Sequence, residues 1–203
     1  MGAMSSKYND SPEKASRAYD ADRDGFVIAG GAGIVVLEDY EHALRRGAHI
    51  YAEVIGYGAT SDGHDMVAPS GEGAMRCMQQ ALTTVDTPID YINAHGTGTP
   101  HNDAAESHAV RDLLGERAGQ VPMSSIKSMV GHTLGAAGAI EAVASVLSLL
   151  HGVLPPTKNL RDPETEFGLD YIPELPRHQQ VEVVLSSSFA FGGNNAALLF
   201  GRG

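Results

Sequence analysis

The stretch YINAHGTGTPHNDAAESHAVRDLL, residues 91–114, decides the fold class of this chain. Its first four residues are a short buried strand by composition, and a loop rich in glycine and threonine follows at 95–102. From Asp103 to Leu114 the spacing of apolar residues is helical, and Glu106 lies three residues after Asp103, the spacing of a capping box. We therefore expect a helix that begins at Asp103. A strand that leads through a loop into a helix is the repeating unit of α/β proteins.

The same alternation extends to both sides of this stretch. The helix expected at 134–151 carries apolar and small residues around most of its circumference, which predicts burial on all sides. We therefore predict an α/β domain whose sheet is covered with helices on both faces. The other expected strands are 26–29, 34–37, 50–57, 123–126, 181–187 and 196–200, and the other expected helices are 38–46 and 71–85.

Composition places the chain among globular proteins of one domain or two small ones. It has 203 residues, of which 42% are hydrophobic and 19% charged. The net charge is −11 and no cluster of lysine and arginine appears, which argues against nucleic acid as a partner. The single cysteine, Cys77, excludes an intrachain disulfide and fits a reducing compartment. With no segment of signal-peptide type and an apolar run at 137–150 that is too short for a bilayer, we expect a soluble, cytoplasmic protein without a membrane anchor.

Three motifs suggest ligands but fit ordinary structure better. Asp20–Gly25 matches the first half of a calcium loop, but the twelfth residue is Gly31 where that loop needs a glutamate. Gly30–Gly33 lacks the spacing of a nucleotide loop and precedes an expected strand. We therefore interpret it as a bulge or tight turn between strands, with nucleotide binding as a weak alternative. His101 and His108 do not have the spacing of a zinc pair on a helix, and we expect them on the surface.

Polar, glycine-rich segments that follow the expected strands are the strongest functional signal. HGTGTP occupies 95–100, Lys127 follows the strand at 123–126, GHTLGAAG occupies 131–138, and FAFGGNN occupies 189–195. Ligand-handling residues of α/β domains lie at strand ends. Two histidines, a lysine and three such loops therefore indicate a functional site.

Taken in order, these motifs resemble one family along almost the whole chain. DxxRDGF at 20–26, the His95 loop, SxKSMVGH at 125–132 and FxFGGxN at 189–195 are similar to the C-terminal half of a β-ketoacyl-ACP synthase of the elongating type, in the thiolase superfamily. Residues 1–24 are polar, with Ser-Pro at 11–12, so we expect them to form an extended segment on the surface. The resemblance implies a thiolase-like half-domain at 25–203, with a mixed sheet layered with helices. It also implies decarboxylative Claisen condensation of an acyl thioester with malonyl-ACP in fatty acid biosynthesis, with no metal or organic cofactor.

The resemblance also implies roles for individual residues. His95 and His132 fall on the two catalytic histidines, and Lys127 falls on the active-site lysine. Glu106 falls on the acid that pairs with that lysine, and Phe191 on the gating phenylalanine whose N–H helps form an oxyanion hole.

Four further residues are implied to bind substrate: Thr97 and Thr99 on the pantetheine arm, and Gly192 and Gly193 beside the gate. The implied partners are acyl carrier protein and either an N-terminal half that carries the nucleophilic cysteine or a homodimer partner.

Two departures from the family pattern bear on activity. The nucleophilic cysteine belongs to the family's N-terminal half, and Cys77 lies within an apolar helix, where it is a small buried hydrophobe. Ala190 stands where the family has glycine, and Asn194 where it has threonine. A non-catalytic subunit that docks on a cysteine-bearing partner or on acyl carrier protein therefore remains the alternative to an enzyme.

The chemistry suits the histidines, because condensation builds negative charge on a thioester oxygen and two neutral imidazoles can donate to it. His132 precedes a long helix, whose positive end we expect to keep the imidazole neutral.

Overall fold

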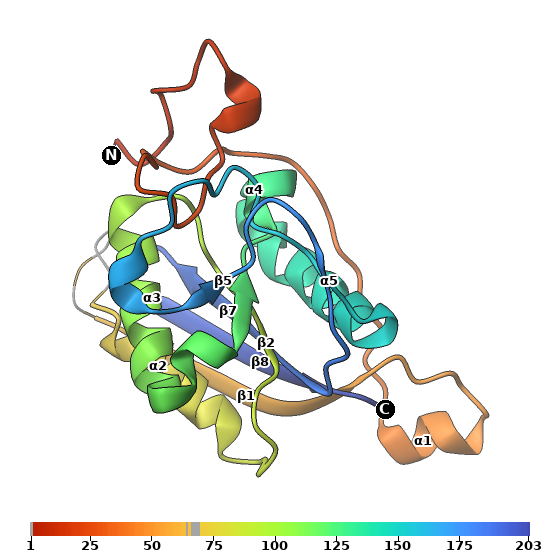
Figure 1. Cartoon of the computed structure of the whole chain (residues 1–203). Helices are drawn as coiled ribbons and strands as arrows, with labels where there is room; N and C mark the ends of the chain where they lie inside the picture. The colour runs from red at the N-terminus through yellow and green to blue at the C-terminus, as the bar shows by residue number, and fades with distance from the viewer. Residues whose placement is uncertain (1, 64, 66–69) are drawn as a thin grey trace.

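The computed structural model describes residues 2–63, 65 and 70–203. Within them, six strands form a mixed sheet in the order β1-β8-β7-β2-β3-β5 (Figure 1). β8 pairs antiparallel with β1 on one side and with β7 on the other. From β7 onward, β2, β3 and β5 follow in parallel pairing. The predicted mixed sheet is confirmed. Its strands are β1 Glu53–Ser61, β2 Tyr91–Asn93, β3 Pro122–Ser124, β5 Asp170–Tyr171, β7 Val183–Ala190 and β8 Asn194–Gly201.

Helices cover both faces of this sheet (Figure 1). α2 (Glu72–Leu82) and α3 (Pro100–Leu114) lie on one face, and α5 (Ala137–His151) lies on the other. The remaining elements are short: α1 Tyr40–Arg45, α4 Lys127–Val130, a strand pair of β4 Val153–Leu154 and β6 Arg177–His178, and 3-10 turns at Pro12–Lys14, Gly115–Gln120, Leu134–Ala136 and Thr165–Phe167.

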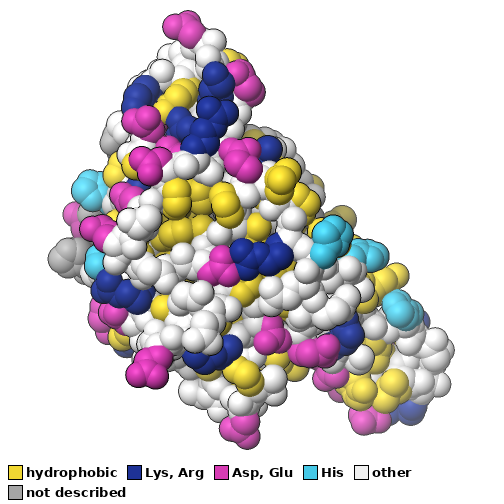
Figure 2. All heavy atoms as spheres, viewed as in Figure 1, with side chains coloured by type: hydrophobic (Ala, Val, Ile, Leu, Met, Phe, Trp, Pro, Cys, Tyr) yellow, Lys and Arg dark blue, Asp and Glu magenta, His cyan; other side chains and the backbone are white. Residues whose placement is uncertain are grey.

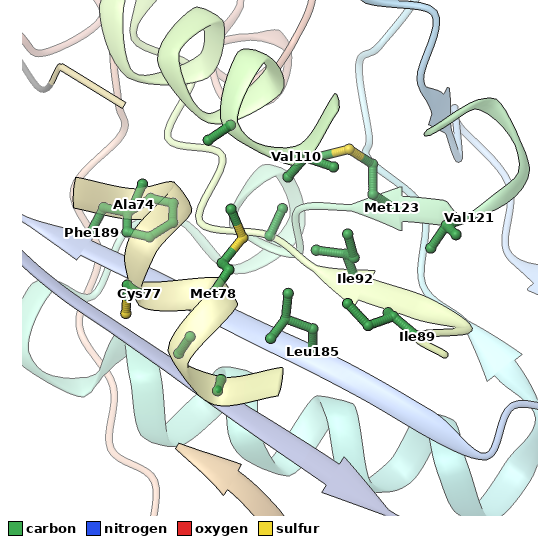
Figure 3. Packing of buried hydrophobic residues seen from close by; sticks show 14 of the residues in the cluster. Ala74, Cys77, Met78, Ile89, Ile92, Val110, Val121, Met123, Leu185 and Phe189 are labelled. Carbon is green, nitrogen blue, oxygen red and sulfur yellow. The ribbon is translucent and has the colours of Figure 1, made fainter. Parts of the chain in front are cut away.

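Apolar side chains of the central strands divide between two cores. Ile92 and Leu185 pack with Met78 beneath α2 and α3, as Figure 3 shows. Tyr91 and Val184, one residue earlier on the same strands, pack against α5. Because successive strand residues point to opposite faces, continuous apolar runs are what a sheet covered on both sides requires.

The prediction that the helix at 134–151 is buried on all sides is wrong. Ala142 and Leu149 face the sheet, but Leu147 is exposed on the opposite side. Burying that side would require another layer, and no described residue supplies one. By length and composition alone Leu134–His151 could cross a membrane, contrary to the expectation that the run is too short. The core helix of a globular protein passes the same test of length and composition, and here the helix packs on the sheet as one layer of the fold.

The strand expected at 34–37 does not form, and the one expected at 26–29 is reduced to isolated bridges. No described strand lies beside residues 34–37 to pair with their backbone, so no strand forms there. Ile34 and Val36 are 88% and 86% exposed. The glycines before them do not make the predicted turn between strands. A Cβ on Gly33 would lie 2.8 Å from Ala139, so the glycines let this segment run against α5.

Helix α3 begins earlier than predicted. Pro100 is its first residue and Thr99 its N-cap, in keeping with the preference for proline at that position. Asp103 is therefore not the cap. Its carboxylate accepts hydrogen bonds from the backbone N–H groups of Thr97 and Gly98 instead.

Part of the segment 1–24 is not on the surface as expected. Tyr19 and Asp20 are each 1% exposed, and the Asp20 carboxylate accepts the backbone N–H groups of Arg161 and Asp162 at 2.8 and 3.1 Å. This part is docked on the loop before η4 (Thr165–Phe167). The division of the chain between residues 24 and 25 stays a prediction.

Three side chains set aside as non-functional lie where expected. His101 and His108 are exposed on α3. Cys77 is buried in the middle of α2, and burial raises the pKa of its thiol to about 11.

Candidate active site

A cavity of about 320 Å³ opens at the edge of the sheet where β2 and β7 end. The structure gathers most of the predicted site residues around it. The cavity is lined by His95, His132, Thr97, Thr99, Phe191 and Gly193, together with Phe26 and Phe189, which the sequence analysis gave no role in the site. Lys127 and Glu106 lie behind the histidine loop, and Gly192 lies outside the lining.

The two histidines face each other at this cavity. Their ring centroids are 5.5 Å apart and the rings are nearly perpendicular. His95 lies two residues after the end of β2. The backbone of His132 is held by the segment at 27–29. Its N–H donates to the carbonyl of Val27, and its carbonyl accepts the N–H of Ala29.

Hydrogen bonding fixes the same tautomer in both rings. The Nδ1 of His132 accepts the backbone N–H of Leu134 at 3.3 Å. The Nδ1 of His95 lies 3.3 Å from the Lys127 ammonium, which can only donate. In the neutral form each imidazole therefore carries its proton on Nε2, where it is available as a donor.

Both imidazoles are neutral at pH 7. Burial lowers the pKa of His95 well below its usual range, and the charge of Lys127 lowers it further. Burial, with a second contribution from Lys127, lowers the pKa of His132 to about 4. The expected cause for His132 was the N-terminus of the long helix, but α5 begins only at Ala137, after a 3-10 turn. Burial and the lysine are the causes instead.

Lys127 does not pair with Glu106 as predicted. Its ammonium forms an ion pair with Glu141 of α5 and donates to the carbonyl of His95 at 2.5 Å. Lys127 is 2% exposed and Glu141 is equally buried. Burial raises the pKa of Glu141, while the attraction of Lys127 opposes that rise. A lone acid within the apolar run 137–150 was the sequence signal for this pair.

Glu106 instead holds the histidine loop. Its carboxylate accepts the backbone N–H groups of His95 and Gly96, both at 2.8 Å. It also accepts the hydroxyls of Tyr19 and Ser187, at 2.8 and 3.0 Å. The sequence analysis missed Tyr19 and Ser187, because neither stands out by type or spacing from other buried residues.

The segment predicted to gate the site is the hairpin between β7 and β8. Phe191 is 48% exposed at the cavity, with its ring centroid 6.5 Å from that of Phe26. Gly192 and Gly193 follow with φ of 81° and 76°, which makes them the turn of this hairpin. Ala190 pairs with Asn194 as the last residue of the ladder, so it lies outside the turn.

The threonines of the histidine loop are close to each other, with Thr97 Oγ1 and Thr99 Oγ1 2.9 Å apart. Both line the cavity, where a substrate group could bind them.

A family model for the β-ketoacyl synthase C-terminal domain matches residues 51–161, which is more than half of the chain. The chain belongs to the β-ketoacyl synthase family. The model of the family's N-terminal domain matches residues 1–43, which include the unpaired apolar residues 34–37. The resemblance seen in the motifs is thus confirmed.

Curated relatives and solved structures agree with this assignment. The chain is 57% identical to 3-oxoacyl-[acyl-carrier-protein] synthase 1 of Haemophilus influenzae, over all of this chain and 50% of the relative. It is 58% identical to the Escherichia coli protein of the same name, over 98% of this chain and 48% of the relative. The chain therefore spans about half the length of the curated relatives it matches.

Among solved structures, a β-ketoacyl synthase from Burkholderia phymatum matches with a TM-score of 0.94 and 44% identity, over the whole chain and 50% of that structure. A type II polyketide ketosynthase, solved in complex with its acyl carrier protein, matches with a TM-score of 0.95 and 40% identity, over the whole chain and 51% of that structure. The predicted thiolase-like fold is confirmed.

Proposed function

We propose that this chain supplies the enolate-stabilising half of a 3-oxoacyl-[acyl-carrier-protein] synthase, which condenses an acyl thioester with malonyl-ACP in fatty acid biosynthesis. The observation that carries the proposal is the pair of neutral histidines at one cavity, 5.5 Å apart, each with its proton on Nε2. Decarboxylation of the malonyl group leaves a carbanion whose charge spreads onto the thioester oxygen. Two donors aimed at that oxygen would each contribute about 10²–10³ in rate.

Lys127 acts behind this pair. It is buried, bonded to the carbonyl of His95 and paired with Glu141, so its ammonium does not line the cavity. Its positive charge disfavours protonation of both imidazoles, and its contact with His95 Nδ1 leaves the proton of the neutral ring on Nε2. The lysine thus keeps the two donors in their working state.

The nucleophile of this reaction has to come from outside these 203 residues. Cys77 is buried in α2 with a raised pKa, so it is neither accessible nor ionised near neutral pH. The surface that would receive a cysteine-bearing partner is the apolar one formed by residues 34–37 and the outer side of α5, where Ile34, Val36 and Leu147 are exposed. Figure 2 also shows hydrophobic side chains on the lobe around α1, which projects away from the sheet in Figure 1. We place the N-terminal half of the enzyme, or a homodimer partner, on these surfaces.

Acyl carrier protein is the proposed substrate carrier. The support is the polyketide ketosynthase that was solved with its own carrier protein. The cavity with Phe191 at its mouth and two threonine hydroxyls inside would accept the carrier's thiol-linked arm. The proposed cellular location is the cytoplasm, a reducing compartment, which agrees with a single, buried cysteine that forms no disulfide.

The test is decarboxylation of malonyl-ACP by this chain combined with a β-ketoacyl synthase N-terminal domain that carries the cysteine. His95→Ala and His132→Ala should each lower turnover by about 10²–10³. His101→Ala, on the exposed side of α3, is the matched control and should leave turnover unchanged. Formation of a stable complex with no decarboxylation would overturn the proposal and leave the docking subunit as the function.

A further inference from the structure

Two buried carboxylates hold the backbone of the histidine loop. Glu106 accepts the N–H groups of His95 and Gly96, and Asp103 accepts those of Thr97 and Gly98 at 3.0 and 3.2 Å. Four consecutive amides of one loop thus point at two carboxylates from α3. Hydrogen bonds to a charged acceptor are about twice as strong as neutral ones, so this arrangement fixes the loop.

A single residue from elsewhere in the sequence contacts both carboxylates, one through its side chain and the other through its backbone. The hydroxyl of Tyr19 donates to Glu106 Oε2 at 2.8 Å, and the backbone N–H of Tyr19 donates to Asp103 Oδ2 at 2.9 Å. Tyr19 is buried, and its ring stacks on Tyr171 with centroids 4.7 Å apart. No other residue bonds to both carboxylates through its own backbone and side chain in the part of the chain that the structure describes.

The backbone of Tyr19 has an unfavourable conformation. Its φ is 64°, in the left-handed region that costs a residue with a Cβ about 1 kcal/mol or more. The next residue is fixed by its bonds to Arg161 and Asp162, and the carbonyl of Tyr19 accepts from Glu164. Strained backbone persists where surrounding contacts over-determine it, and such positions cluster at functional sites.

From these contacts we propose that Tyr19 is a positioning residue for His95, acting through Glu106 and Asp103. This role rests on the proposed function, because it gives His95 its place in the enolate site. Tyr19 lies in the part of the chain that matches the N-terminal domain of the family, whereas both carboxylates lie in the part that matches the C-terminal domain. The residue therefore ties the geometry of the histidine loop to the neighbouring domain.

The experiment is amide hydrogen exchange measured by NMR on this chain, with Tyr19→Phe as the variant. Phenylalanine keeps the ring stack and the N–H bond to Asp103 but removes the hydroxyl donor to Glu106. The amides of His95 and Gly96 should then exchange about fivefold faster or more, relative to strand amides such as that of Leu185, a change equal to the loss of about one ordinary hydrogen bond.

Tyr171→Phe is the matched control, because it removes a neighbouring buried hydroxyl that, among the described residues, bonds to Ser107 and not to the loop. It should leave the exchange ratio of the loop unchanged. In a Glu106→Gln background the effect of Tyr19→Phe on the loop should shrink by at least half, because its route through the carboxylate is altered.

Unchanged loop exchange in Tyr19→Phe, or equal acceleration in Tyr171→Phe, would show that Tyr19 only fills the core and would overturn the proposal. Because exchange is measured without turnover, this result is separable from any failure of the proposed enzymatic function.

Discussion

Replacing Glu141 with glutamine tests the buried ion pair between Lys127 and Glu141. The change keeps the size of the side chain but leaves the Lys127 ammonium, which is 2% exposed, without its carboxylate. Breaking one side of a buried ion pair costs about 3–5 kcal/mol. We expect the lower end, about 3 kcal/mol, because the carbonyl of His95 still accepts from the ammonium at 2.5 Å. For a chain of this length that loss lowers Tm by about 6–12 °C.

The assay is urea unfolding followed by circular dichroism. Glu38→Gln is the control, because it removes the carboxylate of the Arg46 pair on the surface, where solvent screening makes the expected cost much smaller. The double variant Lys127→Met with Glu141→Gln should be less destabilised than the sum of the two single variants. A cost for Glu141→Gln equal to that of Glu38→Gln, or strict additivity in the double variant, would refute the reasoning.

The remaining predictions concern the gate, pH, the cysteine and assembly. With a cysteine-bearing half present, Phe191→Ala should keep malonyl-ACP decarboxylation but lose discrimination between acyl and malonyl loading; decarboxylation lost as fully as in His132→Ala would contradict the gate. Because the folded-state pKa of His132 is about 4 and the unfolded value about 6.5, the unfolded chain binds the proton first. Urea unfolding should therefore show stability falling from pH 6.5 towards pH 4, more steeply than in His132→Ala. In the chain alone, labelled acyl-ACP should not acylate Cys77, and detectable transfer would be the contrary result. Sedimentation at micromolar concentration should show self-association or binding of a family N-terminal domain rather than a compact monomer.

Much of the fold follows from patterns that are local in the sequence. The strand pair around Gly192 and Gly193 could be predicted because apolar runs flank a turn of the right composition. The unpaired segment 34–37 could not, since an apolar run predicts a strand whether or not a neighbouring strand is present. The start of α3 was misplaced because Asp103 fits a capping box by spacing, whereas its carboxylate is used by the loop before the helix.

The candidate site also has a part that the sequence predicts and a part that it does not. The motifs predicted that His95, Lys127 and His132 lie together, and the structure places both histidines at one cavity with Lys127 bonded behind His95. Which acid pairs with the lysine could not be identified, because Glu106 and Glu141 are both buried acids and only the packing of α5 decides between them. Tyr19 had no signal in the sequence, since its role depends on a left-handed backbone and on contacts made across the fold.

The parallel pairing at the centre of the sheet has a consequence for how the site forms during folding. Tyr91 on β2 pairs with Val184 on β7, and Ile92 pairs with Met123 on β3. These pairs join residues that lie far apart in the sequence, which raises contact order. The entropy of closing the long loops is lost before the contacts form, so folding is slow. A chain emerging from the ribosome would already contain both histidines, yet the Phe189 edge of their cavity would be missing until β7 had been synthesised and had docked beside β2. The cavity between the two histidines is therefore among the last parts of the molecule to be completed.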